Sequence, residues 1–137
     1  MTEHDPVEES ETVYRRIPGV FFNGQLTIPV QREAFRPTPK DHTGLSVFRA
    51  QFAQPTDALA NVNPLKVKDY FVARLFVRAL LNLGLTINPE PKAEGPAGHA
   101  VIPQLTWDAY QADKERWKPI LVELAKLASA DIVHRAG

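Results

Sequence analysis

The sequence predicts a small α+β domain with a mixed, mostly antiparallel sheet, one central helix and C-terminal helices. Three observations lead to this class. Hairpin and turn signals between short apolar stretches dominate the first third of the chain. A longer apolar stretch with helical features follows, and the chain ends on segments with clear helical spacing. This order favours α+β over a doubly wound α/β fold.

The composition fits a single globular domain. The chain has 137 residues, of which 44% are hydrophobic and 23% are charged, enough for one core but not comfortably for two. It has no cysteine, which excludes disulfides, thiolate zinc sites and cysteine nucleophiles. No signal-peptide pattern is present, and the longest apolar stretch, Tyr70–Leu85, is interrupted by Arg74, Arg78 and Asn82. We therefore expect a cytoplasmic protein without a membrane span.

The net charge of zero is distributed unevenly along the chain. Residues 1–12 carry five acidic and no basic side chains, so Val13–Gly137 has 11 acidic against 16 basic side chains, a surplus of +5. We expect residues 1–11 to form a disordered acidic tail and residues 12–137 to form the single domain. The basic surplus is either an ordinary solvated surface or a surface for phosphate-bearing ligands.

The first strand is predicted at Thr12–Ile17. Its residues alternate between two faces, one with Val13, Arg15 and Ile17 and the other with Tyr14 and Arg16. A Pro-Gly turn ends this strand. A hairpin is predicted next, because Asn23-Gly24 separates the apolar stretches Val20–Phe22 and Leu26–Val30.

The clearest strand is predicted at Leu45–Ala50. Its alternation places Ser46 and Phe48 on one face, and Leu45 and Val47 on the other. A polar loop, Arg32–Thr43, leads into this strand, with Phe35 as its expected buried side chain. Pro55–Val62 follows as a loop or a single helical turn.

The central helix is predicted over residues 63–83. Asn63-Pro64 combines a capping residue with proline at the first helical position, and Gly84 ends the helix. Six apolar residues form a wide face: Tyr70, Phe71, Leu75, Val77, Leu80 and Leu81. The remaining surface carries Lys66, Lys68, Arg74 and Arg78, which are a solvated helix face or, in the weaker interpretation, a nucleic-acid contact.

Two short strands and the C-terminal helices complete the predicted order. Leu85–Ile87 and His99–Ile102 are the strands, with a long proline-bearing loop between them. Thr106 caps a helix that begins at Trp107, and Pro119 breaks or restarts it. The last helix is predicted from the spacing of Ile120, Leu121, Leu124, Leu127, Ala128 and Ile132.

Few residue patterns in the sequence indicate a catalytic, cofactor-binding or metal site. The chain lacks the phosphate-loop, dinucleotide-binding, zinc-protease and serine-hydrolase signatures. Its four histidines are widely separated in sequence, so we predict no metal site. The remaining candidates are polar residues on predicted strands: Tyr14, Arg15, Arg16, Ser46 and His99. Each also has a structural interpretation, as a surface arginine, a serine bonded to the backbone or a histidine in a turn.

Taken together, these residues resemble the layout of ADP-ribosyltransferase-like toxin domains. The segments that carry the resemblance are Tyr14-Arg15-Arg16, Gly44-Leu45-Ser46-Val47-Phe48 and His99-Ala100-Val101-Ile102-Pro103. Similar segments occur in that order in small intracellular toxins delivered by type VI secretion. The resemblance implies an ADP-ribosyltransferase-like fold that binds NAD in a cleft between two sheet halves. The implied reaction is ADP-ribose transfer or NAD hydrolysis.

The resemblance also implies roles for the five residues. It assigns the NAD ribose or diphosphate to Arg15, with Arg16 as the alternate and Tyr14 beside them. It assigns the nicotinamide end to Ser46, and makes Ser46 and His99 the candidate catalytic residues. However, members of this family use a glutamate late in the sheet, and no acid lies between His99 and Leu105. Either another residue replaces that glutamate, or the domain binds its ligand without turnover.

The alternative function is a non-catalytic interaction module, such as an antitoxin, immunity or adaptor protein of a bacterial toxin or defence system. Trp107, Tyr110 and Trp117 have spacings that allow one shared helix face. That face either packs into the core or binds a protein partner. We expect no nucleic-acid partner.

Overall fold

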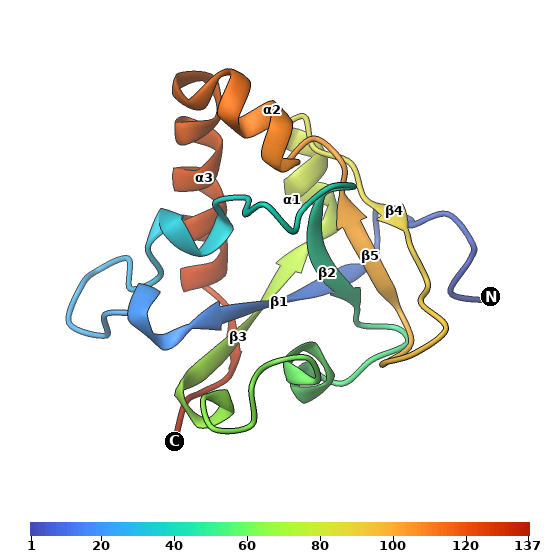
Figure 1. Ribbon diagram of the computed structural model, residues 1–137, viewed down its shortest axis with the longest axis horizontal. Coiled ribbons are helices and arrows are strands. Elements are labelled where there is room, and N and C mark those ends of the chain that lie inside the picture. Colours follow the sequence, from blue (N-terminus) through green and yellow to red (C-terminus); the bar gives the residue numbers. More distant parts are fainter.

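One six-stranded antiparallel sheet organises the computed structural model, which describes residues 1–137 (Figure 1). The strand order is β4-β5-β2-β1-β3-β6. The strands are β1 (Thr12–Pro18), β2 (Leu45–Arg49), β3 (Tyr70–Phe76), β4 (Asn88–Pro89), β5 (His99–Ile102) and β6 (Ile132–His134). The α+β class and the antiparallel sheet are therefore confirmed.

The three central strand predictions, now β1, β2 and β5, are confirmed. In the sheet Tyr14 lies opposite Phe48, and Phe48 lies opposite His99. Gly44 precedes β2 with a φ of 139°, and a Cβ atom there would overlap the carbonyl of Ile102. A glycine is therefore required where β2 begins beside the end of β5.

The prediction of a central helix over residues 63–83 is wrong. Residues 70–76 form β3, which pairs with β1 over its whole length, and only Val77–Asn82 is helical (α1). Both faces of β3 are covered, since Val72 packs in one buried cluster while Ala73 and Leu75 pack in another. A strand buried on both sides loses the polar–apolar alternation and resembles a wide helical face. The structure therefore has no helix over residues 63–83 to present the predicted basic face, and the nucleic-acid contact predicted on that face has no basis.

Of two further predictions, the hairpin is partly confirmed and the strand Leu85–Ile87 is wrong. The Asn23-Gly24 hairpin is reduced to a single bridge between Phe22 and Val30. Pro29, which lacks an N–H group, limits pairing there. Leu85–Ile87 is not a strand, and the pairing with β5 starts three residues later, at Asn88.

The C-terminal helices are α2 (Trp107–Ala112) and α3 (Lys114–Ser129). The Thr106 hydroxyl accepts a hydrogen bond from the Ala109 amide, as expected for the predicted cap. The predicted break at Pro119 is wrong. The helices separate at Asp113, whose carboxylate accepts from the Arg116 amide, and Pro119 lies inside α3.

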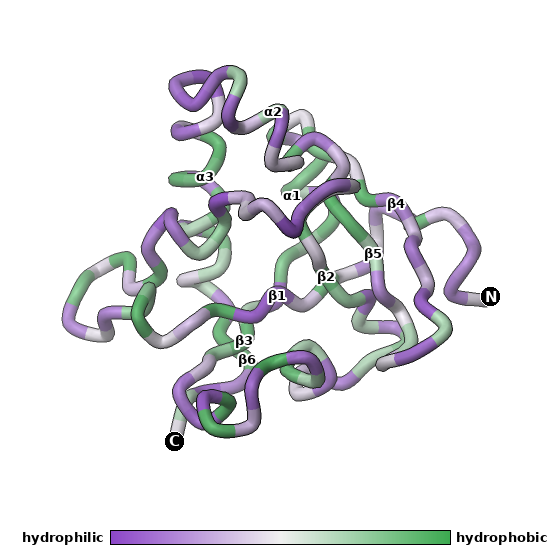
Figure 2. The backbone as a smooth tube through the Cα atoms, in the orientation of Figure 1, coloured by the Kyte–Doolittle hydropathy of each residue, from purple (hydrophilic) through white to green (hydrophobic).

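The sheet has a large core on one side and a small one on the other. The large core joins β1, β2, β3 and β5 to α1 and α3 and contains Phe35, the predicted buried side chain of the Arg32–Thr43 loop. On the opposite face, Phe48 and Val72 pack beneath the short 3₁₀ helix Pro55–Leu59. In Figure 2 the hydrophobic parts of β2, β3 and β5 lie in the middle of the molecule, whereas the middle of β1 is hydrophilic.

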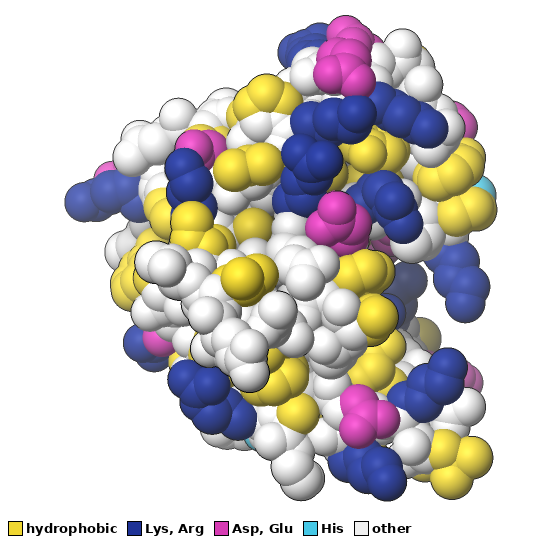
Figure 3. All heavy atoms as spheres, turned by 90° about the vertical axis from the view of Figure 1, so that its left-hand side faces the viewer, with side chains coloured by type: hydrophobic (Ala, Val, Ile, Leu, Met, Phe, Trp, Pro, Cys, Tyr) yellow, Lys and Arg dark blue, Asp and Glu magenta, His cyan; other side chains and the backbone are white.

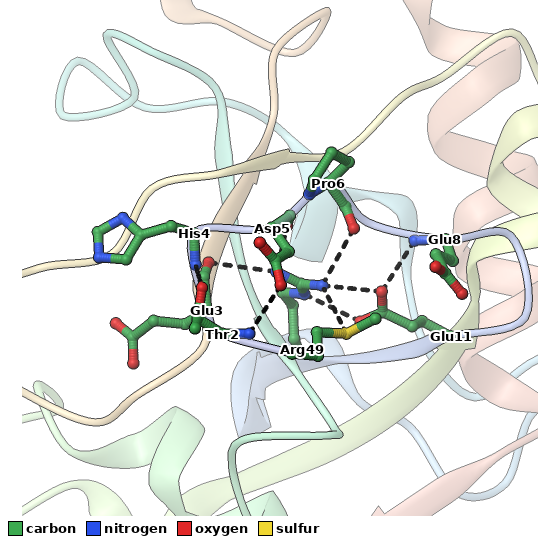
Figure 4. A network of polar contacts seen from close by, with 9 residues as sticks. Thr2, Glu3, His4, Asp5, Pro6, Glu8, Glu11 and Arg49 are labelled. Carbon is green, nitrogen blue, oxygen red and sulfur yellow. Dashed lines mark hydrogen bonds and ion pairs between the residues drawn. The ribbon is translucent and has the colours of Figure 1, made fainter.

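Residues 1–11, predicted as a disordered acidic tail, pass over the side chain of Arg49 in the structure (Figure 4). Arg49 is fully buried, and Glu11 accepts two hydrogen bonds from it, at 2.9 and 2.8 Å. The backbone carbonyls of Glu3, Asp5 and Pro6 accept from its remaining N–H groups. All five guanidinium donors therefore have partners.

We predict that Glu11→Gln strongly destabilises the protein. The change leaves the buried Arg49 without its counter-charge, so the free energy of unfolding should fall by about 3–5 kcal/mol, as for other broken buried ion pairs. Glu9→Gln is the matched control, because the Glu9–Arg78 pair is exposed, with side-chain exposures of 64% and 67%. That change should cost less than about 1 kcal/mol. Urea unfolding measures both, and equal losses would contradict the prediction.

We also predict an acid-sensitive contribution from Glu11. Burial alone would raise the pKa of its carboxyl, but hydrogen bonds from Arg49 and the Glu8 amide, with the charge of Arg49, outweigh burial and leave the pKa lowered from 4.5. A carboxyl with a lower pKa in the folded state contributes stability above its unfolded pKa and loses it as pH falls through the folded pKa. Urea unfolding at decreasing pH should show a loss below 4.5 that is smaller in Glu11→Gln. Parallel pH profiles for the two proteins would show that Glu11 is not the cause.

Candidate functional site

One face of the sheet collects four of the five predicted site residues. Side chains alternate along a strand, so Tyr14 and Arg16 share a face of β1, and Ser46 lies on the same face as Phe48 in β2. The Tyr14–Phe48 and Phe48–His99 pairs place these faces side by side. Tyr14, Arg16, Ser46 and His99 therefore lie together on the side of the sheet opposite α3.

Ser46 and His99 form a hydrogen-bonded pair. The Ser46 Oγ lies 3.1 Å from Nε2 of His99, and Nδ1 of the same ring lies 2.8 Å from the Glu90 carbonyl oxygen. A carbonyl oxygen only accepts hydrogen bonds, so Nδ1 carries the proton of the neutral ring. Nε2 is then an acceptor for the serine hydroxyl. This orientation is the one that a general base needs in order to take a proton from a serine or from a water molecule.

The surroundings of His99 favour its neutral form. Burial lowers the pKa of the imidazole from 6.5, and the charges of Lys92 and Arg16 lower it further. The Glu90 carbonyl and carboxylate act in the opposite direction without reversing the shift. His99 is 5% exposed. At neutral pH the ring is therefore an acceptor at Nε2 rather than a cation.

Glu90 is a site residue that the sequence analysis placed in a loop. The β4–β5 pairing sets Pro89 opposite Ala100, and the Glu90 amide donates to the His99 carbonyl at 2.9 Å. The Glu90 carboxylate consequently lies 3.7 Å from Nδ1 of His99 and 3.7 Å from the Lys92 ammonium. A carboxylate thus reaches the site from the strand before His99, although none follows His99 in the sequence. A hairpin signal around residues 88–100 would have been needed to find it.

Arg15 lies on the opposite face, and its guanidinium is bonded to the protein's own backbone. Its guanidinium donates to the Ser46 carbonyl at 2.9 Å and to the Ala34 carbonyl at 3.0 Å, and its carbon lies 5.9 Å from the centre of the Phe35 ring. Its Nε is shielded from solvent without a hydrogen-bond partner. Burial, followed by the charge of Arg16, lowers the pKa of Arg15 to about 10, which still leaves a cation at neutral pH. Of the two arginines considered for NAD, only Arg16 shares a face with Ser46 and His99.

Neither Ser46 nor His99 lines one of the main surface hollows. No group of three or more His, Asp or Glu side chains is arranged to hold a metal ion. None of the helices has both the length and the hydropathy needed to cross a membrane. The chemistry available here is hydrogen bonding, a neutral base and nearby charges of both signs.

The predicted aromatic face is divided between two helices. Trp107 and Tyr110 belong to α2, whereas Trp117 belongs to α3, because the break at Asp113 separates them. Tyr110 is buried in the large core, and Trp117 is partly buried and packs against that core. The three rings therefore do not form one exposed patch.

Comparisons with protein-family models, with curated proteins and with solved structures find no match to this chain. The interpretation of the site consequently depends on the contacts of its own residues.

We predict that His99 is neutral at pH 7 with its proton on Nδ1. Long-range proton–nitrogen NMR spectra distinguish this tautomer, and a titration should give a pKa below 6.5, because burial disfavours the charged ring. In Ser46→Ala the Nδ1 proton should remain, since the Glu90 carbonyl is still present. A ring protonated on Nε2 would contradict the arrangement of the pair.

Proposed function

We propose that the chain is a toxin-like, ADP-ribosyltransferase-like domain that binds NAD or a related nucleotide on the face of Tyr14, Arg16, Ser46 and His99. The observation that supports this proposal is the convergence on one sheet face of residues from three strands with Glu90. A cationic donor, a hydroxyl, a neutral imidazole and a carboxylate suit the phosphate, sugar and amide groups of a nucleotide. A cytoplasmic setting would supply NAD.

In this proposal Arg16, the alternate implied by the resemblance, takes the role first assigned to Arg15. The guanidinium of Arg15 already donates to two backbone carbonyls and is turned to the other face. Arg16 is half-buried and forms none of the protein's salt bridges. A guanidinium binds a phosphate through two parallel hydrogen bonds, which fits the diphosphate of NAD.

The reaction we propose is transfer of ADP-ribose or hydrolysis of NAD. The bond between the ribose anomeric carbon and the nicotinamide nitrogen breaks, and nicotinamide leaves with the electron pair. An incoming hydroxyl oxygen forms the new bond to that carbon, and its proton passes to Nε2 of His99. Glu90 is the carboxylate that would stabilise the positive charge on the ribose. Ser46 orients the imidazole and contacts the nicotinamide end.

The interaction module is the second candidate. Val20, Leu26 and Ile28 are exposed apolar side chains in one loop region after β1. Such a region fits a protein partner, whereas the dispersed tryptophans do not. A stable partner, together with no response to NAD, would favour this candidate.

We predict that NAD raises the free energy of unfolding, by about 2.7 kcal/mol at 100 times its dissociation constant. Arg16→Ala should weaken NAD binding about 10- to 100-fold, because a hydrogen bond to a charged group is lost. Arg78→Ala, which removes an exposed arginine on α1, is the control and should bind normally. Glu90→Gln should retain binding but release nicotinamide about 100-fold more slowly. The proposal would be refuted if NAD did not stabilise the unmodified protein and the unmodified protein released no nicotinamide from NAD.

A further inference from the structure

A basic groove lies away from the Ser46–His99 pair, between the segment after the 3₁₀ helix Arg32–Phe35 and the two C-terminal helices. Its volume is about 430 Å³. It is lined by Arg36, Pro37, Thr38, Pro39, Trp107, Tyr110, Gln111 and Lys114. Figure 3 shows lysine and arginine side chains gathered in the upper half of this side of the molecule.

The groove continues into a smaller hollow of about 110 Å³, which shares Arg36 and Tyr110 with it. The smaller hollow adds Arg32 and Lys118, with Glu33 as its acidic residue. Four cationic side chains and one carboxylate therefore line the two hollows together. In a chain of zero net charge, this is a local concentration of positive charge.

The cations at the two ends differ in their partners. Arg32 lies 3.7 Å from Glu33, and Lys118 lies 2.8 Å from Glu115 on α3. Arg36 and Lys114 are exposed and form no salt bridge. Both line the larger hollow, so the unneutralised charge lies in the larger of the two hollows.

The walls of the larger hollow are aromatic and polar. Trp107 is half-buried, and both Trp107 and Tyr110 line the hollow. Thr38 and Gln111 add hydrogen-bonding groups. A nucleic-acid base can stack on an aromatic side chain, and this stacking favours binding. Arg36 can bind a phosphate through two hydrogen bonds, and Lys114 can bind one as a point charge.

We propose that this groove binds a nucleoside phosphate, with the base against Trp107 and the phosphates on Arg36 and Lys114. Its volume lies within the usual range of small-ligand sites, about 300–1,000 Å³. A nucleic-acid strand would need a longer basic track. The groove shares no residue with the Tyr14–Arg16–Ser46–His99 face, so it is a second site, independent of the proposed NAD site.

The test is titration of the full chain with ADP at low salt, followed by calorimetry and by tryptophan fluorescence. ADP should bind, and the double variant Arg36→Ala/Lys114→Ala should weaken binding about tenfold or more. Trp107→Phe should weaken it less and remove the fluorescence change. Lys126→Ala is the matched control, because it removes an exposed α3 lysine that pairs with Glu123 outside the groove. Arg16→Ala is the comparison for the other face: ADP binding should fall more in the double variant than in Arg16→Ala, which separates this site from the NAD site.

Urea unfolding of each variant shows that it is folded before its affinity is compared. Binding that weakens with salt and with the double variant, but not with Lys126→Ala, supports the site. Three results would overturn it: no ADP binding, inorganic phosphate binding as tightly as ADP, or a single-stranded oligonucleotide binding more tightly than ADP. Loss of ADP binding in Arg16→Ala alone would also overturn it, since the nucleotide would then occupy the other face.

Discussion

The sheet depends on a short contact between two halves, β4-β5-β2 and β1-β3-β6, which meet only where β1 pairs with β2. That pairing, which we call the seam, consists of two residue pairs, Val13–Arg49 and Tyr14–Phe48. Beyond them the Ser46 carbonyl is bonded not to the β1 backbone but to the side chain of Arg15. Arginine side chains therefore hold both ends of the seam, Arg49 at one end and Arg15 at the other.

The two arginines are suited to this task by their geometry. A guanidinium carries five N–H groups in a fixed plane, so one side chain can bond several carbonyls and a carboxylate at once. Arg49 uses all five and joins the end of β2 to Glu11, just before β1. Arg15 joins β2 to the Ala34 carbonyl. A lysine has a single compact charge and would leave several of these carbonyls without donors, which in a buried position is costly.

The sequence predicted the elements whose signals are local. Turn residues and alternation identify β1 and β2, and Thr106 identifies the start of α2. It did not predict β3, because a strand covered on both faces presents apolar residues without alternation. It also could not select between Arg15 and Arg16. Alternation shows that they point apart, but which of them faces Ser46 depends on the register across the seam.

The position of Glu90 shows the same limit for the site. Ser46 and His99 could be proposed together because each lies in a recognisable strand. Glu90 is adjacent to His99 only through the two-residue strand β4, whose sequence of Asn and Pro is typical of a loop. Long-range pairing, rather than any local propensity, brings this carboxylate to the imidazole.

The seam also determines what a ligand on this face would contact. Arg16 belongs to one half of the sheet, whereas Ser46, His99 and Glu90 belong to or adjoin the other. A ligand that binds both sets spans the seam directly above the Arg15–Ser46 hydrogen bond. Its binding energy would then oppose separation of the halves, and the contacts of Arg15 would in turn fix the distance between Arg16 and Ser46. Arg15 is in this way a positioning residue for the face it does not touch.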